Sequence, residues 1–275
     1  MYSITYIITR DCNTVCNNCP IKKESKSMTA ETFFNVSAVL LSDKLNDFNT
    51  VKFFGGEPLL NFKLIRQGYN FLKKHKNNLK FEIGTNGILL DYEKYSWLYD
   101  KEDIQLNFNA AFAPGEYCFK LKNAMWNLCI QPDNPEAAIQ TVYSLAGKAL
   151  AAGHRINLLP AVYCVWNSDQ LYRLGCVLCK IVSFLDEKGV IIENRTRKGD
   201  IPLFNDGLTV DTDGTVYTSN ICLSDIPKSL QEKVKYKIGE SVYQITKSDL
   251  ISVYGMDKIA SSYAVGYYLE KYACS

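Results

Sequence analysis

One short segment near the N-terminus combines a strand pattern with a cluster of thiols: Ser3-Ile-Thr-Tyr-Ile-Ile-Thr9-Arg-Asp-Cys12-Asn-Thr-Val-Cys16-Asn-Asn-Cys19. Its first seven residues alternate and are rich in β-branched side chains, which predicts a strand. Three cysteines follow within eight residues, on the loop that leaves this strand. Loops at the carboxyl ends of parallel strands are where α/β proteins build their sites, so this loop is the first candidate.

Strand and helix patterns alternate from this segment up to about residue 195. The patterns predict strands over 3–9, 50–54, 79–84, 104–108, 156–165 and 190–193, and helices over 29–45, 61–75, 91–99, 135–152 and 168–187. Such alternation predicts a parallel sheet covered by helices. Six βα units are fewer than the eight of a complete barrel, so we expect an α/β fold with a partial (β/α)6 TIM-like barrel.

The pattern changes after residue 197. Residues 208–217 form two alternating runs around Asp213-Gly214, which predicts a hairpin. We therefore expect a barrel domain over residues 1–197 and a small α+β extension over residues 198–275.

Composition narrows the class of protein. The 275 residues carry 31 Lys+Arg against 29 Asp+Glu, a formal charge of +2, which argues against a nucleic-acid partner. No apolar run reaches the length of a transmembrane helix and no secretory signal is recognisable, so we expect a cytoplasmic protein with no membrane partner. Ten cysteines are many for that compartment, where clustered thiols indicate metal binding or catalysis.

The thiols of Cys12, Cys16 and Cys19 can converge on one metal centre. A structural zinc site needs four ligands, and a [4Fe–4S] cluster is normally held by four cysteines. Three cysteines would leave one iron open to a small molecule. From the residues alone, an iron–sulfur cluster, a zinc ion and uncoordinated thiols all remain possible.

A second motif follows the second expected strand: Phe53-Phe54-Gly55-Gly56-Glu57-Pro58-Leu59-Leu60. Two glycines let the backbone approach a ligand, Glu57 offers a carboxylate to a cation, and Pro58 stiffens the turn. The alternative is a tight turn between a strand and a helix.

Together the two motifs resemble those of the radical S-adenosylmethionine (SAM) superfamily, a Cys-x3-Cys-x2-Cys loop followed by Gly-Gly-Glu. The resemblance implies that Cys12, Cys16 and Cys19 hold a [4Fe–4S] cluster whose fourth iron is chelated by SAM. It implies that Gly55, Gly56, Glu57 and Pro58 bind the methionyl part of SAM. An electron from a flavodoxin- or ferredoxin-type donor would then yield a 5′-deoxyadenosyl radical, which abstracts a substrate hydrogen.

The resemblance implies further SAM contacts. Thr85 and Asn86 match the Thr-Asn-Gly turn of the family, which lies close to the SAM site; the alternative is a plain turn. Asn107 and Asn109 stand where relatives often carry Ser and Asp near the ribose. Asn18 replaces the apolar or aromatic residue that usually covers the adenine.

The remaining cysteines give weaker indications of function. Cys176 and Cys179 lie at helical spacing in an apolar segment, so we expect them in the core. The hairpin resembles the start of a SPASM or twitch extension, which usually precedes an auxiliary cluster. Only Cys222 and Cys274 follow it, and two thiolates cannot hold a four-thiolate cluster. We expect a truncated extension without a second cluster.

The resemblance implies an enzyme that modifies a peptide by cross-linking, epimerisation or oxidation. The alternatives are a radical SAM enzyme for a small molecule (a sugar, nucleoside or cofactor precursor), a glycyl-radical activase and a non-catalytic metal-binding protein.

Overall fold

The computed structural model describes residues 2–16, 19, 21–42, 48–112, 115–161, 166–196, 207–217 and 237–239. They form two compact units. The first contains the described residues up to Gly84 together with 207–217 and 237–239, and the second contains those from Thr85 to 196. Asn18, Cys164, Cys222, Cys274 and most of the expected extension lie outside the described residues.

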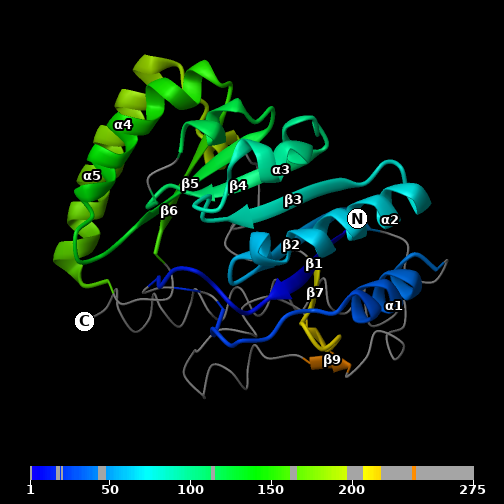
Figure 1. Cartoon of the computed structure of the whole chain (residues 1–275). Coiled ribbons are helices and arrows are strands. Elements are labelled where there is room, and N and C mark those ends of the chain that lie inside the picture. Colours follow the sequence, from blue (N-terminus) through cyan, green and yellow to red (C-terminus); the bar gives the residue numbers. More distant parts are fainter. Residues whose placement is uncertain are drawn as a thin grey trace. The chain divides into compact units, whose positions relative to one another are not determined.

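The sheet of the first unit contains six strands in the order β3-β2-β1-β7-β8-β9 (Figure 1). Their bounds are β1 Tyr2–Thr9, β2 Phe48–Gly55, β3 Lys80–Thr85, β7 Gly207–Val210, β8 Val216–Tyr217 and β9 Lys237–Gly239. Strands β1, β2, β3 and β7 are parallel, whereas β8 and β9 are antiparallel to their neighbours. Strand β1 is therefore a central strand, and its residues from Ser3 to Thr9 are all buried, the polar ones included.

Two helices and a 3₁₀ turn cover one face of this sheet: α1 Ala30–Leu40, η1 Pro58–Asn61 and α2 Phe62–His75. Thr29 caps α1 by accepting from the Thr32 N–H, and the helix, predicted over 29–45, ends at Leu40. Phe33 of α1 packs against Tyr6 of β1, with the rings tilted and their centroids 4.6 Å apart. These aromatic contacts fix the helices over the strands that lead to the motif loops.

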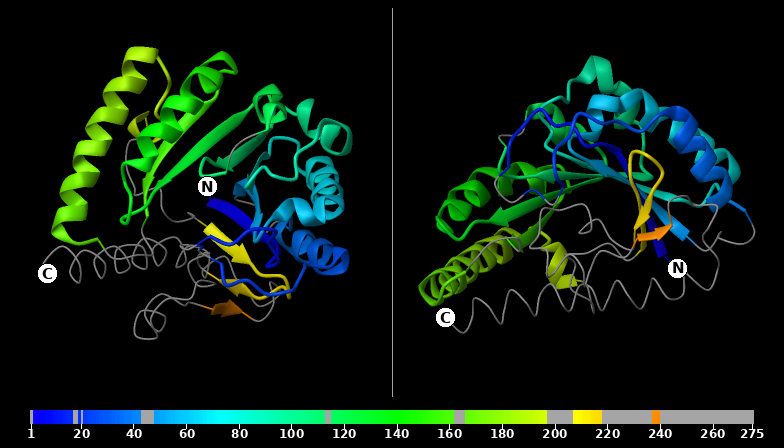
Figure 2. Two further views of the ribbon diagram at one scale, coloured as in Figure 1. Left: turned by 60° about the vertical axis from the view of Figure 1, so that its left-hand side comes forward. Right: turned by 90° about the horizontal axis from the view of Figure 1, so that it is seen from below.

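The hairpin predicted over residues 208–217 is confirmed in β7 and β8. Its turn holds Gly214 at φ 88°, a conformation that favours glycine. Strand β7 pairs in parallel with β1, from Ser3 opposite Gly207 to Tyr6 opposite Val210 (Figure 2). The hairpin is thus continuous with the strand that leads into the cysteines.

The second unit contains three parallel strands in the order β4-β5-β6. Its elements are α3 Tyr92–Tyr99, β4 Ile104–Asn109, η2 Glu116–Lys120, β5 Ala124–Ile130, α4 Ala137–Ala151, β6 Arg155–Pro160, α5 Ser168–Lys188 and α6 Glu193–Thr196. Trp126 of β5 stacks on Phe108 of β4 at 4.5 Å, and α4 meets α5 through Tyr143 and Phe184.

One predicted strand of this unit is wrong, and one strand was not predicted. Residues 190–193 are not a strand: Ile192 makes one isolated bridge to Ile156, and α6 begins at Glu193. Strand β5, which was not predicted, lies between β4 and β6. Its sequence shows no clear periodicity of apolar residues. Helix α5 is capped by Asn167 through a capping box with Gln170. Among the described residues, no helix is both long enough and apolar enough to span a bilayer.

Candidate functional site

The structure joins the two sequence motifs backbone to backbone. The Gly56 N–H donates to the Thr9 carbonyl over 2.7 Å, and the Glu57 N–H donates to the Asp11 carbonyl over 2.8 Å. A Cβ on Gly56 would lie 1.9 Å from the Asp11 carbonyl oxygen, and one on Gly55 would lie 2.0 Å from that of Thr9. Both glycines are therefore needed for the glycine loop (Gly55–Pro58) to reach the segment that precedes Cys12.

The cysteines lie on a loop that is closed at its base. Thr9 and Ser27 form an antiparallel bridge, and the Arg10 N–H donates to the Lys26 carbonyl over 2.8 Å. We call residues 10–26 the cysteine loop. Closure at the base confines all three cysteines to one short excursion of the chain beyond the end of β1.

The three thiols are free and half-buried. Cys19 packs against the buried pair Ile7 and Ile21. Burial raises the pKa of the Cys19 thiol, the Ile21 N–H and Lys23 lower it, and Cys16 and Cys12 raise it further.

The donor set fits an iron–sulfur cluster by its chemistry, since thiolates are the ligands that such clusters take from proteins. In the part of the chain that the structure describes, no three metal-ligating side chains already converge on one point. Holding a metal centre would therefore draw the three thiols closer together within the closed loop.

Glu57 is completely buried at the start of η1. Its Oε1 accepts the Leu59 N–H over 3.0 Å, so the side chain caps the 3₁₀ turn, and Pro58 is the first residue of that turn. The cap therefore fixes the Glu57 side chain within the glycine loop.

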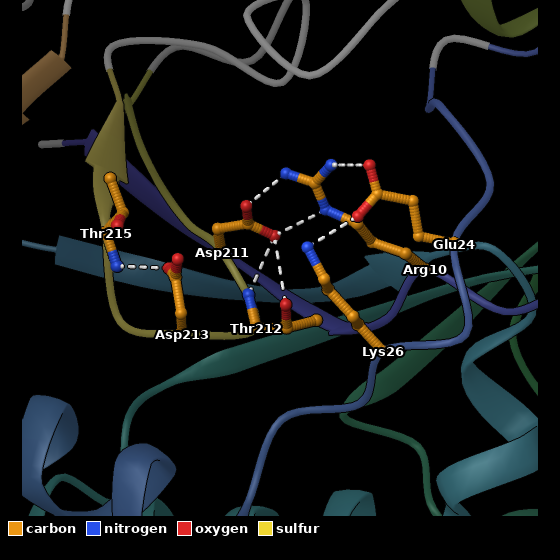
Figure 3. A network of polar contacts seen from close by, with 7 residues as sticks. All are labelled: Arg10, Glu24, Lys26, Asp211, Thr212, Asp213 and Thr215. Carbon is orange, nitrogen blue, oxygen red and sulfur yellow. Dashed lines mark hydrogen bonds and ion pairs between the residues drawn. The ribbon is translucent and has the colours of Figure 1, made fainter.

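An ion pair that sequence reasoning missed lies at the base of the cysteine loop (Figure 3). Arg10 donates to Asp211 through Nε over 2.9 Å and through Nη2 to the second carboxylate oxygen. Glu24 lies 3.6 Å from Arg10 and 2.7 Å from Lys26. Arg10 follows β1 and Asp211 follows β7, so only the pairing of these strands brings the two residues together.

Thr85 and Asn86 lie in a turn that their own side chains stabilise. Thr85 Oγ1 accepts the Gly87 N–H and Asn86 Oδ1 accepts the Ile88 N–H, each over 3.0 Å. Gly87 has φ 78°. These bonds are those of the plain turn, and a contact of either residue with SAM remains a prediction.

Asn107 and Asn109 lie on β4, and Asn109 begins a row of amides across three strands. It is opposite Asn127 of β5, which is opposite Asn157 of β6. Asn157 Nδ2 donates to Asn127 Oδ1 over 2.9 Å, and its buried Oδ1 has no hydrogen-bond partner in the described structure. Sequence reasoning missed Asn127 because it missed β5.

Asn107 is held by a separate chain of polar contacts. Its Oδ1 accepts from Gln105 Nε2 over 2.6 Å, and Gln105 Oε1 accepts from Arg155. Arg155 in turn pairs with Glu193 at 2.7 Å. The side chain of Asn107 is therefore oriented by Gln105, which lies two residues earlier on the same strand.

The prediction that Cys176 and Cys179 pack in the core is wrong. Both are exposed on α5. The buried face of that helix consists of Leu174, Val177, Ile181 and Leu185. Cys118 is buried, and burial raises the pKa of its thiol to about 11.

Comparisons with known proteins show the fold. No family model and no curated protein matches the chain. Among solved structures, anSMEcpe with bound AdoMet matches with a TM-score of 0.64 at 14% identity, over 94% of this chain and 82% of that one. The same protein with bound AdoMet and the Kp18Cys peptide matches with a TM-score of 0.63 at 15% identity, over 94% of this chain and 83% of that one. Streptococcus suis SuiB bound to precursor peptide SuiA matches with a TM-score of 0.54 at 12% identity, over 78% of this chain and 58% of that one.

At such identities the likeness is one of fold. It confirms the predicted α/β class and partial barrel, and the predicted resemblance to radical SAM enzymes in fold.

Proposed function

We propose that the chain is a radical SAM enzyme that modifies a peptide. The observation that carries the proposal is the junction of the cysteine loop with the glycine loop, where Gly56 and Glu57 donate to Thr9 and Asp11. It occurs on a fold shared with enzymes described with bound AdoMet. Cysteines that bound no ligand would not require a second loop to be hydrogen-bonded to the segment directly before them.

Cys12, Cys16 and Cys19 would hold the [4Fe–4S] cluster, because they are three soft ligands confined to one closed loop. The cluster that they would hold would supply one-electron reduction of SAM, the chemistry that would provide a 5′-deoxyadenosyl radical for removing a substrate hydrogen. The electron would come from a flavodoxin- or ferredoxin-type donor.

Glu57 would bind the methionyl ammonium. Its side chain is buried and oriented by the cap of η1, and a carboxylate held in one orientation is suited to a charge-assisted hydrogen bond with an ammonium. Gly55, Gly56 and Pro58 would shape the backbone around this group. Thr85, Asn86, Asn107, Asn109 and Asn18 would contribute the remaining contacts to SAM.

The row Asn109, Asn127 and Asn157 supports a peptide substrate rather than a small molecule. Side-chain amides match the donor and acceptor pattern of a peptide bond, and Asn127 and Asn157 are already paired in this way across β5 and β6. The peptides bound in structures of anSMEcpe and SuiB agree with this choice.

Anaerobic reconstitution with iron and sulfide tests the proposal. We expect about four irons per chain, absorbance of the cluster that responds to SAM, and 5′-deoxyadenosine on addition of dithionite and SAM. Mass analysis of co-purifying peptides should find a modified peptide, whereas a modified small molecule would favour the alternative substrate class. A colourless protein that binds zinc instead would contradict the proposed function.

A further inference from the structure

The hairpin (residues 207–217) contacts the cysteine loop at two separate points. At the base of the loop, Asp211 accepts two N–H groups of Arg10 (Figure 3). Farther along, Tyr217 packs against the same Ile7 and Ile21 pair that Cys19 packs against. The hairpin therefore supports the cysteine loop both before its first cysteine and beside its last.

The ion pair is shielded from solvent. The side chains of Arg10 and Asp211 are 13% and 5% exposed. Two parallel N–H···O bonds hold the guanidinium in one orientation, and low exposure limits screening by water and salt. If Asp211 lost its charge, Arg10 would keep a buried positive charge with Glu24 at 3.6 Å as its remaining carboxylate.

Arg10 transmits this constraint into the loop through its backbone. Its N–H donates to the Lys26 carbonyl over 2.8 Å, and its carbonyl accepts the Glu24 N–H over 3.2 Å. Cys12 follows only two residues later. A change in the orientation of Arg10 therefore alters the closure that confines the three cysteines.

We propose that Asp211 is a positioning residue for the cysteine loop: through Arg10 it holds the loop closed and thereby sets how firmly the chain retains its cluster. Residues 207–217 would then contribute to cofactor binding. The effect on retention of the cluster rests on the proposed function, but the closure of the loop can be measured without a cluster.

The first experiment uses the full-length protein without its cluster. Iodoacetamide alkylation is followed for each cysteine by peptide mass spectrometry in the wild type and in Asp211→Asn. We expect Cys12 and Cys19 to react about tenfold faster in the variant, the factor that corresponds to losing one charge-assisted hydrogen bond. Cys176 and Cys179, exposed on α5, serve as internal references and should keep their rates.

The second experiment uses the reconstituted protein. Iron release to a chelator should be about tenfold faster in Asp211→Asn than in the wild type. Asp213→Asn is the matched control, because Asp213 lies in the same turn and acts on Arg10 through its charge, but its hydrogen bonds are with Thr215 and its own backbone rather than with Arg10. That variant should release iron at the wild-type rate.

Arg10→Lys provides a second test if Asp211→Asn does not fold. Lysine keeps the charge but cannot make the paired bonds of a guanidinium, so alkylation rates should lie between those of the wild type and Asp211→Asn. Unchanged alkylation of Cys12 and Cys19 in both variants overturns the proposal, and so does an equal effect of Asp213→Asn. A wild-type protein that binds no cluster would instead overturn the proposed function, and leave the alkylation result to decide whether Asp211 closes the loop.

Discussion

Glu57 and Asp11 are joined by a backbone hydrogen bond of 2.8 Å, from the N–H of Glu57 to the carbonyl of Asp11. This bond ties the residue proposed to bind SAM to the residue directly before the first proposed cluster ligand. Gly56 permits it, because any Cβ at that position would overlap the Asp11 carbonyl.

Gly56→Ala should therefore separate the two loops. The added Cβ would meet backbone at 1.9 Å, and backbone cannot rotate away as a flexible side chain can. We expect the free energy of unfolding of the cluster-free protein to fall by about 1–3 kcal/mol, and SAM binding to be lost. Urea unfolding and isothermal titration with SAM measure the two effects.

Gly147→Ala is the control for this prediction. Gly147 lies inside α4 with no atom within 4 Å of an added Cβ. Alanine there should stabilise the protein by about 0.4–1 kcal/mol, because it restricts the unfolded chain and favours helix. Equal behaviour of the two variants would show that the junction does not depend on Gly56.

Glu57→Gln should weaken SAM binding and spare the fold. The amide oxygen of Gln can still accept the Leu59 N–H, so the cap of η1 persists while the charge is lost. We expect SAM affinity to fall by about 1.5–3 kcal/mol, the value of a charged hydrogen bond. Iron content should not change. Unchanged affinity, or loss of the cluster, would argue against the role proposed for Glu57.

Alanine at Cys12, Cys16 or Cys19 should abolish the cluster, because each of the three thiolates is used and none is spare. The measurement is iron content and cluster absorbance after anaerobic reconstitution. Cys176→Ala and Cys179→Ala are the matched controls, since both thiols are free and exposed on α5. A full SAM-responsive cluster in Cys16→Ala would contradict the assignment.

Local patterns predicted those parts of the fold and site that short segments determine. Thr29 and Asp91 were recognisable as helix starts, and Asp213-Gly214 as a turn, because capping and turn residues act within a few positions. The spacing of the cysteines and the Gly-Gly-Glu motif identified the candidate site for the same reason.

Features that depend on strand pairing could not be predicted in this way. The contact between Arg10 and Asp211 exists only because β7 lies beside β1, and nothing near either residue indicates the other. Strand β5 was missed because Met125, Trp126, Asn127 and Leu128 follow no clear alternation. Their burial is set by neighbours in β4 and β6 rather than by their own sequence.

The last prediction concerns His154, which is buried in the second unit and pairs through both ring nitrogens. Trp126 Nε1 lies 3.2 Å from Nδ1, and the Leu121 carbonyl lies 2.9 Å from Nε2. Because the indole can only donate, Nδ1 accepts, and the neutral ring donates through Nε2. Burial lowers the pKa of His154 below its ordinary value of 6.5. Protonation would replace the acceptor at Nδ1 with a second donor facing the indole N–H.

A lowered pKa means that the unfolded chain binds more protons than the folded one as the pH falls through 6.5. The stabilisation is present above that pH and is lost below it, by at most about 1.4 kcal/mol per pH unit. Urea unfolding of the cluster-free protein at about pH 7.5 and about pH 5.5 measures the loss. His154→Gln should reduce the difference between the two, whereas His75→Gln, which changes an exposed ring, should preserve it. If His154→Gln keeps the wild-type pH dependence, some group other than this imidazole is responsible, and the neutral ring between Trp126 and Leu121 is not what favours folding at higher pH.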